Sequence, residues 1–147
     1  MNFFKFKTQL ITRNSILIMN TQVKLAVRPV GFPTDETWTI EKNEIPTAGE
    51  GEMVVENHYL SIDPAMRGWL MDRKSYLPPV QIGEVMRALG VGKVIESNIE
   101  KFPVGSFVSG AAGIQQYCLT NGKGWFQVDP NLVPLPVYTS AMGMTGF

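Results

Sequence analysis

Short β-prone runs separated by glycine and proline turns are the feature that most constrains the fold of this chain. Pro29, Gly31 and Pro33 mark the first turn, and Pro46 and Gly49 mark the next. Runs bounded in this way are typical of β-strands. They cover residues 22–28, 37–40, 53–62, 84–97, 104–109, 114–119 and 125–128. Their order and spacing predict a mainly β fold, a closed or nearly closed antiparallel barrel.

Glycines and a helical ending refine this picture. Gly90 and Gly92 interrupt the run 84–97. Glycine inside a strand indicates a bulge or a close approach of two backbones. The Gly90-Val91-Gly92 triplet is therefore interpreted as a barrel bulge, and only the chain from Tyr138 onward is expected to be helical for more than a turn.

Composition excludes several classes of function. The 13 basic and 13 acidic residues cancel and form no basic run, which argues against nucleic-acid binding. No apolar run approaches the length of a membrane-spanning helix. Cys118 is the only cysteine and His58 the only histidine, so a zinc site would lack ligands. Cys118 is expected to be a buried, inert thiol, and a single cysteine fits a reducing compartment such as the cytoplasm.

The two ends of the chain differ from the β-rich part. Residues 1–20 contain Lys5, Lys7 and Arg13 and no acid. Such a segment suits a mitochondrial transit peptide, or an upstream extension with Met19 as the natural start, and it is left out of the fold prediction. Residues 136–147 look like the start of a helix that continues beyond them.

The stretch from Tyr59 to Trp69 combines a strand end, an Asp63-Pro64 stop and a predicted short helix. It is either a packed barrel corner or a binding turn at the end of a rigid element. Arg67 could hold a carboxylate or phosphate, or it could pair with Asp63 or Asp72. Tyr59 and Trp69 are expected to be packing residues.

Motifs along the chain, taken together and in order, resemble the medium-chain dehydrogenase/reductase superfamily. The similar branch is the zinc-free prostaglandin reductase and leukotriene hydroxydehydrogenase group. The motifs are Arg28-Pro29-Val30-Gly31, Tyr59-Leu60-Ser61-Ile62-Asp63-Pro64 with Met66-Arg67-Gly68, Gly83-Glu84-Val85, Gly90-Val91-Gly92-Lys93 and Gly143-Met144-Thr145-Gly146. The resemblance implies a GroES-like, partly open β-barrel with short helices over 22–135. It implies that 136–147 begin a linker helix towards a Rossmann cofactor domain that this chain does not contain.

The resemblance also implies a reaction: hydride transfer from NADPH to the β-carbon of an α,β-unsaturated ketone or aldehyde, without zinc. It gives no catalytic residue in this chain. Cofactor contacts are expected from Asp63, Pro64, Met144 and Thr145, and substrate contacts from Ala65, Arg67, Gly110 and Ala111. Ala65 stands where many members have a tyrosine, and the small Gly110 and Ala111 suggest room for a bulky substrate.

Alternative functions remain open at this stage. The chain could be a non-catalytic binding module without a cofactor, or part of a quinone reductase. A full-length enzyme is expected to act on a small molecule as a homodimer, without nucleic acid or membrane partners. The barrel face that would meet a second domain is expected to expose apolar side chains, which would make the isolated chain prone to association.

Overall fold

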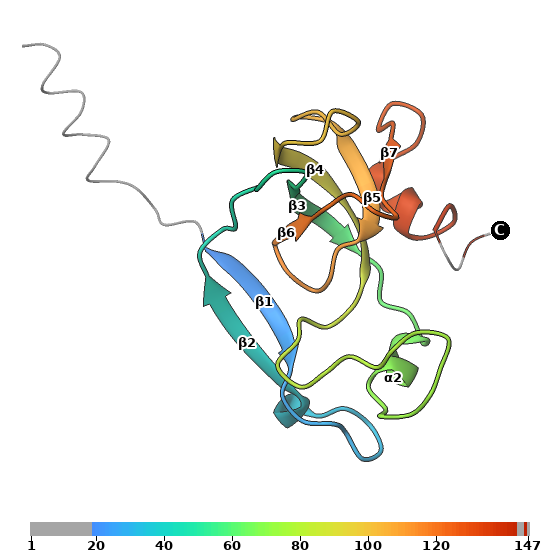
Figure 1. Cartoon of the computed structure of the whole chain (residues 1–147). Helices are drawn as coiled ribbons and strands as arrows, with labels where there is room; N and C mark the ends of the chain where they lie inside the picture. The colour runs from blue at the N-terminus through green and yellow to red at the C-terminus, as the bar shows by residue number, and fades with distance from the viewer. Residues whose placement is uncertain (1–18, 144–145, 147) are drawn as a thin grey trace, which may run out of the picture.

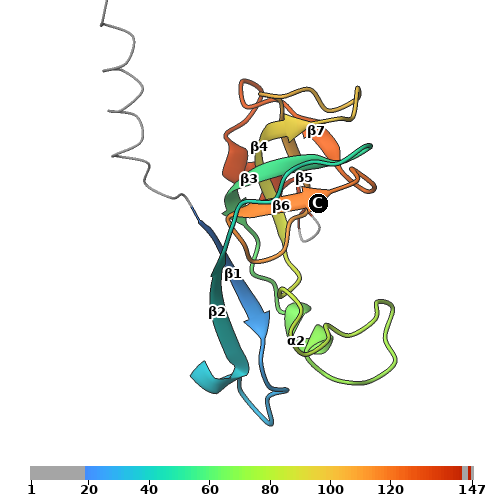
Figure 2. The same ribbon diagram turned by 60° about the vertical axis from the view of Figure 1, so that its left-hand side comes forward.

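The computed structural model describes residues 19–143 and residue 146, and it places the strands in two antiparallel sheets (Figure 1). The smaller sheet pairs β1 with β2, and the larger has the order β6-β3-β4-β5-β7. The strands are β1 (Asn20–Leu25), β2 (Trp38–Asn43), β3 (Met53–Leu60), β4 (Leu89–Ser97), β5 (Phe107–Ala111), β6 (Tyr117–Thr120) and β7 (Phe126–Val128). The expected mainly β fold is confirmed, and Figure 2 shows the β1–β2 hairpin extending away from the five-stranded sheet.

Three short helical segments complete the described part of the chain: η1 (Asp35–Thr37), α2 (Met66–Trp69) and η2 (Leu135–Thr139). The short helix expected after Pro64 is α2. The segment η2 begins three residues before Tyr138, where helix was first expected, because Pro136 suits the first turn of a helix. This segment packs against β3 and β4 and buries the Tyr138 ring.

Two hydrophobic clusters account for most of the core. The first lies inside the five-stranded sheet and includes the fully buried Val55, Val94 and Val108 with the Trp125 ring. The second lies under α2 and joins it to the hairpin. Its members are Leu25, Met66, Trp69, Leu70, Val80, Met86 and Ala88. The second cluster therefore packs α2 against β1 and the segment 86–88.

The segment 84–88 differs from the prediction, because only Leu89–Ser97 of the run 84–97 forms a regular strand. The backbone of Leu25 donates a hydrogen bond to the Glu84 carbonyl, and Met86 donates to the Val23 carbonyl. Ile114 in turn donates to the Met86 carbonyl. The segment therefore divides its backbone hydrogen bonds between β1 and the 114 loop, and it joins the two sheets.

The predicted bulge is confirmed between β3 and β4. The pairing register shifts between Asn57 and Tyr59, opposite Gly92 and Val91. A Cβ atom placed on Gly92 would lie 2.1 Å from the Glu56 carbonyl oxygen. Only glycine permits this approach of the two backbones, so Gly92 fixes the local twist of the sheet.

Amide side chains join the hairpin to the loop before β6. The Asn20 side chain donates to the Tyr117 carbonyl at 2.9 Å and accepts a hydrogen bond from the Tyr117 N–H at 2.9 Å. The Gln22 Nε2 group donates to Gln115 Oε1 at 2.7 Å. These bonds, which we call the amide seam, join β1 to residues 115–117.

Candidate functional site

The turn after β3 is fixed by hydrogen bonds on both sides. The Ser61 N–H donates to the Leu89 carbonyl at 2.8 Å, which attaches the turn to the start of β4. The Ser61 hydroxyl donates to Asp63 Oδ2 at 2.7 Å, and the Met66 N–H donates to the Asp63 carbonyl at 3.0 Å. Asp63 is half-buried, whereas Pro64 and Ala65 are exposed. The Asp63 carboxylate is thus held in one orientation with its second oxygen available.

Arg67 does not form the acid pair that was considered for it. Its guanidinium donates to the Gly31 carbonyl, and neither Asp63 nor Asp72 lies within ion-pair distance. In return, Arg28 donates to the Leu70 carbonyl at 2.9 Å. Two arginines therefore link the loop after β1 and the helix α2 reciprocally, because a guanidinium offers several donors to backbone carbonyls.

The aromatic residues of this stretch behave differently from each other. Trp69 is 4% exposed and its indole N–H donates to the Tyr76 hydroxyl at 3.1 Å, so its packing role is confirmed. Tyr59 is 46% exposed, so the expectation that it packs was wrong. It lies directly after the register shift in β3.

A cavity of about 230 Å³ lies between η2 and the outer face of β4, β5 and β7, and we call it the η2 cavity. Gly110, one of the predicted substrate contacts, is part of its wall. Gly143 lies at the other side, immediately before the predicted cofactor contacts Met144 and Thr145, which fall outside the described residues. Among the described residues, the lining is Leu89, Ser109, Gly110, Gly124, Phe126, Tyr138, Thr139, Met142 and Gly143.

The structure gives a different reason for the small size of Gly110. A Cβ atom on Gly110 would lie 2.3 Å from the Trp125 ring, so the missing side chain makes room for the indole. Ala111 is exposed at the end of β5, where it pairs with Leu89.

The predicted site residues form two neighbouring groups. Gly110 lines the η2 cavity, and Asp63, Pro64, Ala65 and Arg67 belong to the turn before α2. Leu89 connects them, because its side chain lines the cavity and its carbonyl accepts the Ser61 hydrogen bond. Of the lining residues, sequence reasoning had named only Gly110 as a site residue, and it missed the larger side chains Leu89, Phe126, Tyr138 and Met142 among the others. The outward-facing alternation of β4 and β7 could have indicated Leu89 and Phe126.

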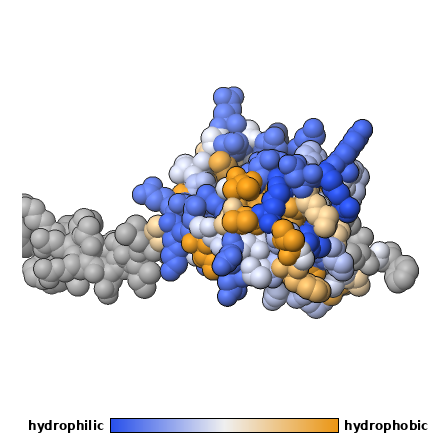
Figure 3. Space-filling view, turned by 90° about the horizontal axis from the view of Figure 1, so that it is seen from below, coloured by the Kyte–Doolittle hydropathy of each residue, from blue (hydrophilic) through white to orange (hydrophobic). Residues whose placement is uncertain are grey.

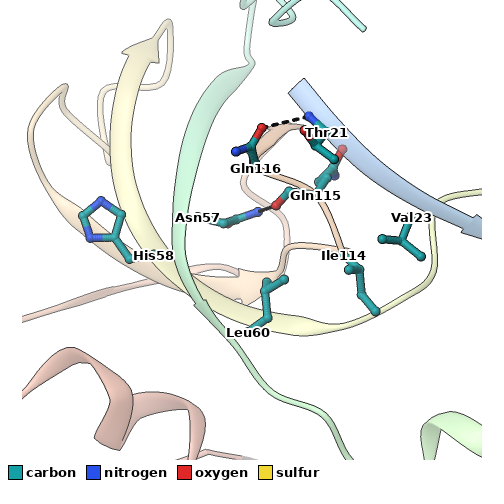
Figure 4. A pocket seen from close by; sticks show the side chains of 8 residues that line it. All are labelled: Thr21, Val23, Asn57, His58, Leu60, Ile114, Gln115 and Gln116. Carbon is teal, nitrogen blue, oxygen red and sulfur yellow. Dashed lines mark hydrogen bonds between the residues drawn. The ribbon is translucent and has the colours of Figure 1, made fainter. Parts of the chain in front are cut away.

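A second, larger depression of about 430 Å³ lies along the amide seam. Figure 4 shows Thr21, Asn57, Gln115 and Gln116 facing one another there, with the Thr21 N–H donating to Gln116 Oε1 at 3.0 Å. His58 lies on the other side of β3 in the same view. The Asn57 amide donates to the Gln115 carbonyl at 2.9 Å and the Gln115 amide donates to the Ala112 carbonyl at 2.8 Å, which favours a structural role for them in the loop 112–116.

The side chains that could bind a metal do not converge in the described part of the chain, where no group of three His, Cys, Asp or Glu residues is found. Cys118 is buried, and that burial raises the pKa of its thiol to about 11. The thiol is therefore protonated at neutral pH and inert, as expected.

The surface of the molecule exposes scattered apolar side chains. Tyr59, Ile62, Phe126 and Met142 are each between 46% and 73% exposed. The face seen in Figure 3 shows hydrophobic groups lying among hydrophilic ones. Among the described residues, no helix has the length and apolar character needed to cross a membrane.

Comparison with known proteins identifies the fold and its family. The family model described as the N-terminal domain of oxidoreductase matches residues 21–128. The chain belongs to this family, as an N-terminal GroES-like domain of the medium-chain dehydrogenase/reductase superfamily in the branch of the curcumin, prostaglandin and alkenal reductases.

Individual relatives support the assignment to this branch. The NADPH-dependent curcumin reductase of Escherichia coli is 37% identical over 87% of this chain, and the 2-alkenal reductase (NADP(+)-dependent) of Nicotiana tabacum is 34% identical over 88%. The matches cover 37% and 39% of those two proteins, so the chain spans less than two fifths of their length. The crystal structure of CurA in complex with NADPH from Vibrio vulnificus superposes with a TM-score of 0.77 at 39% identity, over 84% of this chain and 37% of that one.

Proposed function

We propose that this chain is the substrate-side domain of an NADPH-dependent oxidoreductase that reduces the C=C bond of α,β-unsaturated ketones or aldehydes. Curcumin reductase, 2-alkenal reductase and prostaglandin reductase 1 are all among its relatives, and the first two are described as NADP-dependent. The observation that carries the proposal is the η2 cavity, an apolar recess beside the fixed Asp63 turn.

The reaction adds a hydride to the β-carbon and a proton to the α-carbon of the enone, so that the C=C bond becomes a C–C bond. NADPH would supply the hydride when it is bound, and the protein orients the substrate and excludes water. In this chain the walls of the η2 cavity would hold the body of the substrate. Negative charge that develops on the enone oxygen needs a hydrogen-bond donor, and we assign none of the described residues to that role.

The residues present fit only one end of the cofactor. The sequence contains no G-x-G-x-x-G turn after a strand, the usual cradle for a dinucleotide diphosphate. The half-buried Asp63 carboxylate, with one oxygen bonded to Ser61 and the other available, could accept a hydrogen bond from the carboxamide of a nicotinamide. We therefore propose Asp63 and Pro64 as contacts of the nicotinamide end, and Ala65, Arg67, Gly110 and Ala111 as the substrate side.

The domain organisation and location are part of the same proposal. Residues 22–135 form the barrel domain, residues 136–147 lead towards a cofactor domain, and the enzyme works in the cytoplasm.

A chimera tests this function. Residues 21–143, which include every described lining residue of the η2 cavity, would replace the matching segment of the Escherichia coli curcumin reductase, and NADPH oxidation would be followed by absorbance with 4-phenylbut-3-en-2-one. We expect turnover that requires both NADPH and the enone, and a product saturated at the C=C bond by mass spectrometry. A folded chimera that binds NADPH but turns over no enone or alkenal would refute the proposal. Turnover confined to quinones would assign the chain to quinone reduction instead.

A further inference from the structure

The β1–β2 hairpin has a strand edge without a partner strand. Among the described residues β2 pairs with β1 alone, whereas β1 also bonds to the segments 83–86 and 114–116. The strand β2 is six residues long, against four for β6 and three for β7 at the edges of the larger sheet. Both ribbon views place β2 on the outer side of the hairpin (Figure 1, Figure 2). It therefore offers the longest free strand edge in the part of the chain that the structure describes.

The backbone of β1 alternates between its two neighbours. The N–H groups of Val23 and Leu25 donate to carbonyls of the segments 114–116 and 83–86, at 2.9 Å and 3.0 Å. The carbonyls of the same two residues accept hydrogen bonds from 83–86, and the Thr21 carbonyl accepts one from 114–116. The odd-numbered residues of β1 thus bond away from β2, so the even-numbered residues are the ones that bond to it.

This alternation fixes the direction of the backbone groups in β2. In an antiparallel ladder only alternate pairs of opposite residues exchange hydrogen bonds. Glu41 lies opposite the even-numbered Gln22, so its backbone groups face β1, and those of Ile40 and Lys42 face the open edge. The Trp38 carbonyl faces the same edge, while the Trp38 N–H donates within η1. Among the described residues, none of the groups at the open edge has a hydrogen-bond partner.

We infer that β2 pairs antiparallel with β2 of a second copy of this chain, about a two-fold axis at Ile40. Each Ile40 N–H donates to the Ile40 carbonyl of the other copy, and each Lys42 N–H donates to the Trp38 carbonyl of the other copy. The two Ile40 side chains, each 69% exposed in the single chain, cover one another. Such an edge is a template for a further strand, and a two-fold pairing satisfies both edges and closes.

Charge selects this register over its neighbours. Outward-facing residues must oppose outward-facing residues, so the pairing can slip only by two positions. With Ile40 on the axis, Glu41 lies opposite Thr39, whose hydroxyl can donate to it, and the Lys42 ammonium lies beside the Trp38 ring in a cation–π arrangement. One slip places Glu41 opposite Glu41 in a close, non-hydrogen-bonded pair, which like charges oppose. The opposite slip leaves Lys42 without a strand residue to face.

A proline at position 42 tests the pairing, because it removes only an outward N–H. Edge strands tolerate proline at such positions. Sedimentation velocity of the full 147-residue chain over a concentration series should show a reversible dimer, a weak one because the interface is small. Lys42→Ala is the matched control, since it loses the same side chain but keeps the N–H. Lys42→Pro should dimerise at least about tenfold more weakly than Lys42→Ala, because two hydrogen bonds are lost per dimer.

Cysteine variants measure the register directly. Thr39 of one copy lies opposite Glu41 of the other, at a Cα separation of about 4.5 Å, which a disulfide can bridge. Identical residues face each other diagonally at about 7 to 8 Å, which is too far. An oxidised mixture of Thr39→Cys and Glu41→Cys chains should therefore form a cross-linked dimer with one chain of each, and neither variant alone should do so. Cys118 is buried and does not compete.

Each result decides for or against the inference. A chain that stays monomeric across the concentration series overturns it, and leaves the edge of β2 to residues 1–18 or to another protein. Equal dimerisation of Lys42→Pro and Lys42→Ala overturns it too, because association then uses another surface. Circular dichroism checks that Lys42→Pro is folded; if it is not, the cysteine mixture decides. Cross-linking of Glu41→Cys with itself contradicts the register.

The inference does not rest on the proposed function. The described lining of the η2 cavity includes no residue of β2, so the paired edge and the cavity are separate surfaces. Turnover of enones by the chimera and pairing of the hairpins are measured independently. Either proposal can therefore fail while the other stands.

Discussion

Replacing Gly110 by alanine should destabilise the domain through one identifiable contact. A Cβ atom at this position would lie 2.3 Å, 2.6 Å and 2.7 Å from three atoms of the Trp125 indole, whereas ordinary contact begins at 3.4 Å. Trp125 is only 4% exposed and packs with Val94 and Val108, so the ring has no free space to move into. Overpacking of this kind costs about 1 to 3 kcal/mol, and the depth of the overlap favours about 2 to 3.

Urea and thermal unfolding, followed by circular dichroism, would measure the effect. A loss of about 2 to 3 kcal/mol should lower the midpoint of thermal unfolding by about 6 to 15 °C for a domain of this size. Gly68→Ala is the matched control, because Gly68 lies in α2 and has no heavy atom within 4 Å of its added Cβ. That change should leave the stability equal or raise it by up to about 1 kcal/mol.

A double-mutant cycle assigns the loss to the indole. Trp125→Leu should itself destabilise the core, but the added cost of Gly110→Ala should shrink in its presence because the clash is gone. Two results would refute the reasoning: an unchanged unfolding midpoint for Gly110→Ala, or full additivity of the two changes.

Three further predictions concern titration and binding. Burial raises the pKa of the Cys118 thiol in the folded chain to about 11, above the pKa of about 8.5 of a thiol in the unfolded chain. The buried, protonated thiol therefore contributes fully to the stability below about pH 8.5. That contribution is lost as the pH rises towards 11. Urea titrations across that pH interval should show a decline in the free energy of unfolding, and Cys118→Ala should remove it. A decline of the same size in the variant would contradict the assignment to Cys118. The pKa of Glu41 is lowered by hydrogen bonds from Lys24 and then Asn43. In an NMR titration of the carboxyl groups, Lys24→Ala should raise the pKa of Glu41, whereas Lys42→Ala should leave it unchanged. An unchanged pKa of Glu41 in Lys24→Ala would count against the ion pair between Lys24 and Glu41. Calorimetry should show only weak binding of NADPH to the isolated chain, because its sequence has no dinucleotide-binding turn. Micromolar affinity would show that other residues of the chain bind the dinucleotide.

The sequence was sufficient to predict the mainly β fold, the bulge beside Gly92 and the short helix after Pro64, because each follows from local backbone chemistry. Glycine permits unusual backbone conformations and proline excludes regular ones in the same way whatever surrounds them. The segment 84–88 was assigned wrongly to a strand for the opposite reason. Its backbone pairing depends on β1 and on the 114 loop, which lie far away in the sequence.

The site was predictable only in part. The turn at Asp63 was found because its residues are adjacent in the sequence and form a recognisable motif. The η2 cavity combines residues from β4, β5, β7 and the chain after η2, and no local pattern indicates that they meet. The packing of Gly110 against the Trp125 ring could not be foreseen for the same reason, since that ring comes from a different segment of the chain.

The reciprocal hydrogen bonds between Asn20 and Tyr117 also bear on how the chain acquires its shape during synthesis. The two residues are 97 positions apart, so the Asn20 end of the β1–β2 hairpin has no partner until Tyr117 has left the ribosome. The Leu25 end can pair earlier, with residues 83–86. At about 5 to 20 residues per second, that interval lasts about 5 to 20 s. During this time the unpaired strand edges are open to wrong partners. Pairings of such long range also close slowly once both sides are present. The hairpin is therefore the part of this domain for which a chaperone has the longest opportunity to act.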